Sequence, residues 1–227
     1  MIRLALDVVG AMGTRVPVSA TDWHYLTQVM RRDSGDSIEV LCRDGLVFEA
    51  ILLDGQQVEI RDAVAHLRKP GRHITLYQAL LKGDHFSAVV ERATEAGISR
   101  FVPLVTERSI VRDVSPNRAS RWRAIAKEAS EQCQRPDVPL VADMMRLTDL
   151  AATSGCDAFV LDPRARDARP WLLPSAAPLE LVIGPEGGFT PTELDLLSER
   201  GFLPLSLGER VYRAENAGAF AAVLFLQ

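Results

Sequence analysis

The sequence predicts an α/β protein in which a small β-rich domain, residues 1–70, precedes a larger domain with a mostly parallel sheet, residues 71–227. Two observations lead to this prediction. In the first segment short apolar runs are separated by Asp-Gly pairs, which are typical of antiparallel hairpins. From residue 73 short continuous apolar runs alternate with segments of helical periodicity, which indicates strands buried on both faces and connected by helices.

The first domain is expected to be a small sheet with one helix. Its strands are expected at residues 36–42, 46–53 and 56–60. The helix is expected at residues 19–32, with Ser19 or Thr21 as its N-cap. A charged segment with Pro and Gly, residues 68–73, is the expected linker to the second domain.

The second domain is expected to alternate strands and helices. Its strands are expected at residues 73–80, 100–106, 157–162, 179–184 and 203–208, the last centred on Leu205–Leu207. Its helices are expected at residues 83–97, 115–135, 191–200 and 214–227. Gly97 is expected just past the end of its helix, because glycine tolerates the left-handed conformation of that position.

Composition argues against several classes of protein. No apolar run approaches the roughly 20 residues that cross a bilayer, and the N-terminus lacks a secretory signal, so a cytoplasmic location is expected. The cysteines and histidines lack the spacing of metal ligands or of a disulfide framework, so no metal is expected.

The net charge is −4, but positive charge is concentrated in one part of the chain. Residues 72–135 carry 11 Lys and Arg against 7 acids, whereas residues 136–227 carry 7 against 13. A basic face suits an RNA partner. A solvated helix face explains the same pattern, and charge alone favours that simpler interpretation.

The segment Ile183–Leu194, IGPEGGFTPTEL, follows an apolar run. Its three glycines remove side chains, so that backbone groups approach a ligand closely. Thr190 and Glu193 are spaced as a capping box, and Pro191 suits the first helical position. The loop therefore joins the end of a strand to a helix, the place where open α/β sheets bind ligands. A tight structural turn is the alternative.

The segment Leu205–Phe220 repeats this arrangement, with Gly208 opening a loop and a helix starting near Glu215. Arg210, Arg213 and Glu215 lie close together in the sequence. They either cap the helix and pair with one another, or face an anionic substrate and a proton that is to be transferred.

Together these two segments resemble the C-terminal signature of the bacterial 16S ribosomal RNA uridine-N3 methyltransferases, a family of the SPOUT superfamily. Residues 24–40, 76–109 and 121–139 resemble further motifs of that family, so the resemblance spans the chain. Two positions depart from it: Asn216 replaces a usual threonine, and His85 stands where lysine is common.

The resemblance implies a PUA-like barrel at residues 1–70 and a SPOUT domain with a deep trefoil knot. It implies S-adenosylmethionine as cofactor, a homodimer, and one uridine of 16S ribosomal RNA in the small subunit as substrate. The implied cofactor-binding residues are Leu161, Ile183, Gly184, Pro185, Glu186, Gly188, Leu205, Leu207, Gly208, Val211 and Asn216. Glu186 has two interpretations, a contact to the cofactor amine or to amides of its own loop.

By the same resemblance Arg213 and Glu215 are catalytic. Uridine N3 needs to lose a proton, so Glu215 takes or relays it while Arg213 steadies the base. The reverse possibility is that Glu215 only orients Arg213.

The implied RNA-binding residues are Arg3, His24, Arg31, Lys82 and Arg108. Ordinary surface roles are the alternative for each. Trp122 and Trp171 are candidates for stacking on a base, but the helical apolar pattern around Trp122 favours core packing. Two other functions remain open: methylation of another RNA, and a non-catalytic RNA-binding or ribosome-assembly protein.

Overall fold

The computed structural model describes residues 2–64, 71–165 and 175–226. The chain divides into two compact units, one of residues 1–69 with 130–138 and the other of residues 70–129 with 139–227. Part of the predicted linker and Trp171 lie outside the described residues. No helix in the described ranges is long and apolar enough to cross a membrane.

The first unit contains a five-stranded sheet whose strands lie in the order β1-β3-β4-β5-β2. The strands are β1 (Arg3–Leu6), β2 (Arg15–Pro17), β3 (Ser37–Cys42), β4 (Val47–Leu53) and β5 (Gln57–Ala63). β1 pairs parallel with β3, and the other pairs are antiparallel. The predicted hairpins are confirmed, with Gly45 and Gly55 in the left-handed conformation at their turns. Identification of this sheet as a PUA-like barrel stays a prediction.

The predicted helix 19–32 is shorter than expected. Ser19 caps α1 (Ala20–His24) by accepting a hydrogen bond from the backbone N–H of Asp22 at 3.1 Å. The chain then forms a π-helical turn, η1 (Tyr25–Val29). The Thr27 hydroxyl donates to the carbonyl of Trp23 at 2.9 Å, competing for the acceptor that an α-helix would assign to a backbone N–H.

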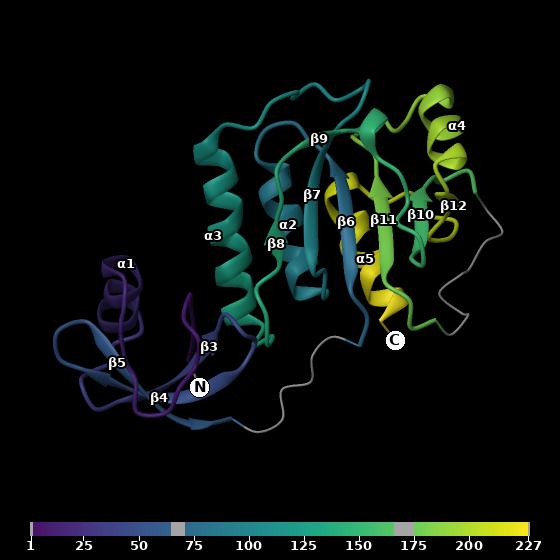
Figure 1. Cartoon of the computed structure of the whole chain (residues 1–227). Helices are drawn as coiled ribbons and strands as arrows, with labels where there is room; N and C mark the ends of the chain where they lie inside the picture. The colour runs from purple at the N-terminus through teal and green to yellow at the C-terminus, as the bar shows by residue number, and fades with distance from the viewer. Residues whose placement is uncertain (1, 65–70, 166–174, 227) are drawn as a thin grey trace. The chain divides into compact units, whose positions relative to one another are not determined.

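The second unit contains a seven-stranded sheet in the order β12-β10-β11-β6-β7-β8, with β9 also on β7 (Figure 1). The strands are β6 (Ile74–Ala79), β7 (Arg100–Val105), β8 (Leu140–Val141), β9 (Met145–Arg146), β10 (Asp157–Leu161), β11 (Leu179–Ile183) and β12 (Leu203–Leu205). Every pair in this sheet is parallel, as predicted. Whether the chain forms a trefoil knot here stays a prediction.

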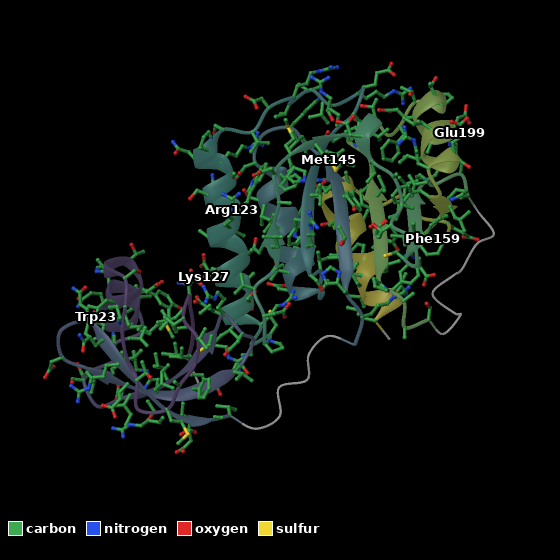
Figure 2. The ribbon with its side chains drawn as sticks, viewed as in Figure 1. Trp23, Arg123, Lys127, Met145, Phe159 and Glu199 are labelled. Carbon is green, nitrogen blue, oxygen red and sulfur yellow. The ribbon has the colours of Figure 1, made fainter. Side chains whose placement is uncertain are left out.

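Helices cover both faces of this sheet. They are α2 (His85–Glu95), α3 (Pro116–Gln132, counted with this unit up to residue 129), α4 (Pro191–Glu199) and α5 (Ala214–Phe225), with the 3-10 turn η2 (Leu147–Asp149). Because side chains alternate along a strand, Phe159 of β10 (labelled in Figure 2) joins the core with α2 and α5, while Val160 joins the core with α4. Trp122 is fully buried against Phe86, so its predicted core role is confirmed.

Gly97 tests how α2 is ended. It lies two residues after α2 at φ +98°, and an added Cβ would lie 2.6 Å from Cδ1 of Leu226. We expect Gly97→Ala to lower the free energy of unfolding by about 1–2 kcal/mol, from left-handed strain alone, and by more if Leu226 cannot move. Urea unfolding measures this change.

Gly155→Ala is the matched control. Gly155 has φ +82° but nothing within 4 Å of an added Cβ. Its substitution should therefore lower the free energy of unfolding by the left-handed strain alone, without a steric clash like that of Gly97 with Leu226. Equal losses in both variants would mean that the contact with Leu226 contributes nothing.

Candidate functional site

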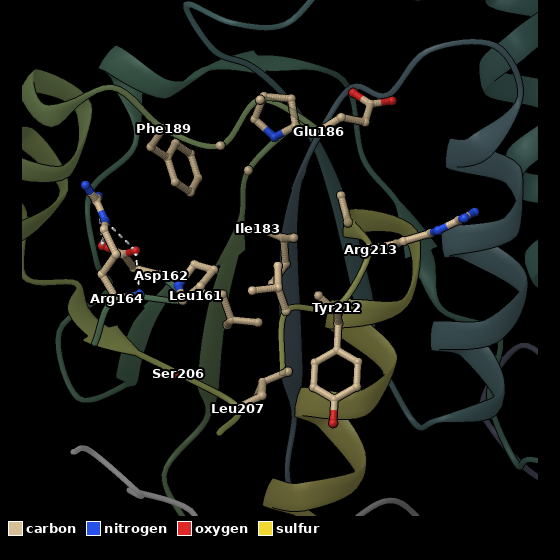
Figure 3. A pocket seen from close by; sticks show the side chains of 18 of the residues that line it. Leu161, Asp162, Arg164, Ile183, Glu186, Phe189, Ser206, Leu207, Tyr212 and Arg213 are labelled. Carbon is tan, nitrogen blue, oxygen red and sulfur yellow. Dashed lines mark hydrogen bonds and ion pairs between the residues drawn. The ribbon is translucent and has the colours of Figure 1, made fainter. Parts of the chain in front are cut away.

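A cavity of about 710 Å³ lies in the second unit, where β10, β11 and β12 end. Because these strands are parallel, their following loops emerge at the same edge of the sheet. The described lining is His85, Arg108, residues 161–164, 183–189, 205–207 and 210–217 except 216, and Leu194. Leu161 and Ile183 line its centre, with Phe189 on one side (Figure 3).

The loop after β11 is shaped by its glycines. Gly188 adopts φ +66°, and its N–H donates to the carbonyl of Pro185 at 2.8 Å to close a turn. The ring of Phe189 packs over Gly184, where a Cβ would approach it to 3.1 Å. The predicted capping box is confirmed, since Thr190 and Glu193 each accept a hydrogen bond from the other's backbone N–H. The glycines therefore keep backbone groups accessible along this wall.

Neighbouring loops hold the β11 loop in place. Glu186 accepts a hydrogen bond from the backbone N–H of Lys82 at 3.0 Å, in the loop after β6, rather than from an amide of its own loop. Its contact to the cofactor amine stays a prediction. In the loop after β7, Arg108 donates to the carbonyls of Gly187 at 2.7 Å and Phe189 at 3.3 Å. Glu193 also accepts from the N–H of Glu107 at 2.8 Å.

Strand β12, which precedes the third loop and was predicted at residues 203–208, ends earlier, at Leu205. The hydroxyl of Ser206 donates to the carbonyl of Gly208 at 3.0 Å, and accepts from its N–H at 3.3 Å. Gly208 has φ +111°, a conformation that strands do not contain. This local turn replaces the strand pairing, and Leu207 becomes part of the cavity wall.

Glu215 lies in the first turn of α5 and lines the cavity with its side chain 11% exposed. Its Oε1 lies 3.8 Å from a guanidinium nitrogen of Arg213, whose side chain is 82% exposed. The same Oε1 lies 3.8 Å from Nδ1 of His85, at the start of α2. Both distances are longer than hydrogen bonds, so Glu215 keeps capacity to accept one.

Asp162 and Arg164 form a further charged pair on the cavity wall (Figure 3), which the sequence analysis missed. Asp162 Oδ1 accepts from the backbone N–H of Arg164 at 3.0 Å and from its guanidinium at 2.9 Å. Burial alone would raise the pKa of Asp162, but the hydrogen bonds and charge of Arg164 outweigh it and lower the pKa. The carboxylate is thus held ionised next to the cavity. An acid directly after a buried strand was the available signal.

The structure brings together most of the predicted cofactor-binding residues and both predicted catalytic ones. Gly208 and Asn216 do not belong to the described lining. Gly208 instead shapes the third loop, and Asn216 accepts a hydrogen bond from Arg92 on α2. Their predicted contacts with the cofactor stay predictions.

The predicted RNA-binding residues fall into different surroundings. His24, Arg31 and Lys82 are exposed. Arg3 is buried: it pairs with Glu39 at 2.6 Å and donates to the carbonyls of Gln134 and Arg135, all within the first unit. Its donors are occupied inside the protein, so the predicted phosphate contact is wrong for Arg3. Arg108 lines the cavity and donates to carbonyls of the β11 loop instead of forming a surface ion pair, and its RNA contact stays a prediction.

Arg108→Met tests this interaction. Without the guanidinium, the carbonyls of Gly187 and Phe189 lose their donor, and the loop should open more easily. We expect backbone amide hydrogen exchange at Gly188, whose N–H is bonded to Pro185, to become about tenfold faster, which corresponds to one hydrogen bond of about 1.4 kcal/mol. Hydrogen exchange followed by NMR measures it.

Arg121→Met is the control, because Arg121 forms an exposed ion pair with Asp84 and is not part of the described cavity lining. Unchanged exchange in Arg108→Met, or an equal change in Arg121→Met, would contradict the assigned role.

Comparisons with known proteins agree with this geometry. The family of RNA methyltransferase domains matches residues 68–226. A protein of Synechocystis named ribosomal RNA small subunit methyltransferase E is 34% identical over 91% of this chain and 71% of its own. Its namesake from Bacillus subtilis is 30% identical over 90% of this chain and 86% of its own. The structure of ribosomal RNA small subunit methyltransferase E from Neisseria gonorrhoeae, bound to S-adenosyl methionine, superposes with a TM-score of 0.87 at 26% identity, covering 98% of this chain and 95% of that one.

Proposed function

The chain belongs to the ribosomal RNA small subunit methyltransferase E family, and from this premise we propose that it methylates N3 of one uridine in 16S ribosomal RNA. The methyl donor is S-adenosylmethionine and the substrate lies in the small ribosomal subunit. The observation that carries the proposal is the placement of Glu215, a mostly buried carboxylate in the wall of a cavity at the strand ends.

The cavity fits the proposed cofactor in size and chemistry. Its volume of about 710 Å³ lies within the range of small-molecule sites. Leucine, isoleucine and valine side chains form apolar walls, and the glycine loop exposes backbone groups that hydrogen-bond an adenine. The residues that would hold the cofactor are Leu161, Ile183, Gly184, Pro185, Glu186, Gly188, Leu205, Leu207 and Val211. When bound, S-adenosylmethionine supplies a methyl group on a positively charged sulfur.

Glu215 is suited to remove the proton from uridine N3. Its carboxylate lines the cavity, and its Oε1 lies 3.8 Å from both the Arg213 guanidinium and Nδ1 of His85, which is longer than a hydrogen bond. A base that is already hydrogen-bonded would first have to give up that bond. The long contact supports the base role over the role of orienting Arg213.

Arg213 is suited to contact the substrate. Its side chain is 82% exposed and in Figure 3 extends away from the apolar centre near Ile183. A guanidinium at the mouth of the cavity stabilises negative charge that develops on the uracil oxygens as N3 loses its proton. The target base leaves its stack to reach this position.

The remaining expectations from the family belong to the same proposal. The loops after β10, β11 and β12 are the loops of the trefoil knot, and the first unit is the PUA-like barrel that contacts RNA through the exposed His24 and Arg31. The enzyme is a homodimer, which is supported by the exposed Phe220 and Val223 on α5. It acts in the cytoplasm, where small ribosomal subunits are assembled.

The proposed substrate is tested with labelled S-adenosylmethionine and small ribosomal subunits that lack the modification. After digestion of the RNA we expect label in N3-methyluridine from a single site, because methylation of N3 requires a base and Glu215 in the cavity wall would supply it. Transfer RNA is the control. Label on a ribose, another base or transfer RNA would overturn the substrate, and neither label nor cofactor binding by calorimetry would favour a non-catalytic RNA-binding protein.

Glu215→Gln tests the base. The amide keeps the shape of the side chain but does not accept the proton, so we expect kcat to fall about a hundredfold while S-adenosylmethionine affinity is retained. Glu209→Gln, an exposed position in the loop before α5, is the matched control and should keep the rate of the unaltered protein.

The double variant Arg213→Ala with Glu215→Gln separates the two roles of Glu215. If Glu215 only orients Arg213, then Arg213→Ala alone removes as much rate as Glu215→Gln, and the double variant is no slower. That result would contradict the base assignment.

A further inference from the structure

Two polar contacts join the first turn of α5 to α2. His85 Nδ1 lies 3.8 Å from Glu215 Oε1, and the guanidinium of Arg92 donates to the side-chain oxygen of Asn216. His85 and Arg92 are seven residues apart, about two helical turns, and therefore lie on the same face of α2. The contact between His85 and Glu215 therefore belongs to the interface between α2 and α5 and is one of two polar contacts there.

The packing below these contacts fixes the distance between the helices. Val90 and Ala93 of α2 belong to the same buried cluster as Ala217 and Ala221 of α5. Small side chains on α5 let the helices pack closely, and buried packing resists displacement. The first turn of α5 therefore has little freedom to move away from His85.

Other carboxylates near His85 are engaged elsewhere. Asp84 accepts hydrogen bonds from Ser87 and Arg121, and Glu186 accepts one from the backbone of Lys82. Glu215 is the carboxylate within 4 Å of the His85 ring among the described ion pairs. The His85 side chain lines the cavity yet is 53% exposed, so it connects Glu215 to solvent.

We propose that His85 accepts the proton that Glu215 removes from uridine N3 and passes it to solvent. This inference rests on the proposed function. The N3–H bond breaks with its electron pair staying on N3, and the proton forms an O–H bond on Glu215. That bond breaks as the proton moves to Nδ1 of His85, and the imidazolium then gives a proton to water. The charge on Glu215 is restored for the next turnover.

The distance of 3.8 Å is compatible with this role. Hydrogen bonds between catalytic groups are often long before the substrate binds and shorten in the complex. A half-exposed side chain at the start of a helix rotates at little cost, so His85 reaches Glu215 without movement of α2. His85 does not contact the substrate in this scheme. It acts on Glu215, by taking the proton from the carboxyl group and passing it to water.

The test is His85→Ala in multiple-turnover methylation of small ribosomal subunits. We expect kcat to fall about tenfold while KM for the RNA and the calorimetric affinity for S-adenosylmethionine stay within about twofold. Added imidazole should restore most of the lost rate, because the exposed position leaves room for it. His85→Gln, which does not take up a proton, should lose as much as His85→Ala.

His73→Ala is the matched control, an exposed histidine directly before β6 at the opposite end of the sheet, and it should keep the full rate. A rate in His85→Ala equal to that of the unaltered protein would overturn the inference. So would a loss that imidazole does not restore. Absence of methylation by the unaltered protein would instead overturn the proposed function.

A second readout needs no activity. In the protein without ligands, Glu215→Gln should shift the imidazole NMR signals of His85, because its Nδ1 lies 3.8 Å from the altered side chain, whereas the signals of His73 stay unchanged. Unchanged signals of His85 would show that the two side chains do not interact and would overturn the inference even if the enzyme is active.

Discussion

The parallel pairing of β10, β11 and β12 is the constraint on which the site depends. In a parallel sheet all strands leave the core at the same edge, so three loops that are distant in sequence line one cavity. The arrangement requires strands buried on both faces, which the alternation of Phe159 and Val160 between two cores provides. A substitution that removed the burial of either face of β10 would therefore disturb the arrangement of the loops, even with every loop residue unaltered.

The β11 loop exposes backbone groups at the end of the sheet, and side-chain hydrogen bonds with the neighbouring loops hold it in place. Glu186 binds the amide after β6, while Arg108 and Glu193 connect the β11 loop to the segment after β7. These contacts join loops that follow different strands. Each loop is therefore stabilised by the loops that the strand order places beside it, in addition to its own turns. The glycines permit the loop's conformation, and the charged side chains restrict it to one.

Sequence patterns predicted the features that arise from neighbouring residues. The capping box of Thr190 and Glu193, the parallel sheet and the position of Glu215 near a helix start all follow local rules. Features set by residues far apart in the chain were missed or wrong. Arg3 pairs with Glu39, and Asn216 accepts a hydrogen bond from Arg92. The spacing of these residues in the sequence does not predict either contact. Strand β12 ends early because the hydroxyl of Ser206 hydrogen-bonds the backbone carbonyl and N–H of Gly208 in a local turn.

The contrast in exposure around Glu215 suits the proposed role of one carboxylate that takes a proton from uridine N3 and releases it toward solvent. A fully exposed carboxylate would be hydrated and poorly aimed, and a fully buried one would have no way to lose the proton it took. Glu215 is mostly covered, while Arg213 on one side is mostly exposed and His85 on the other is half-exposed. In the proposed mechanism the substrate therefore approaches Glu215 from the cavity, beside the exposed guanidinium of Arg213, while the half-exposed His85 connects the same oxygen to solvent.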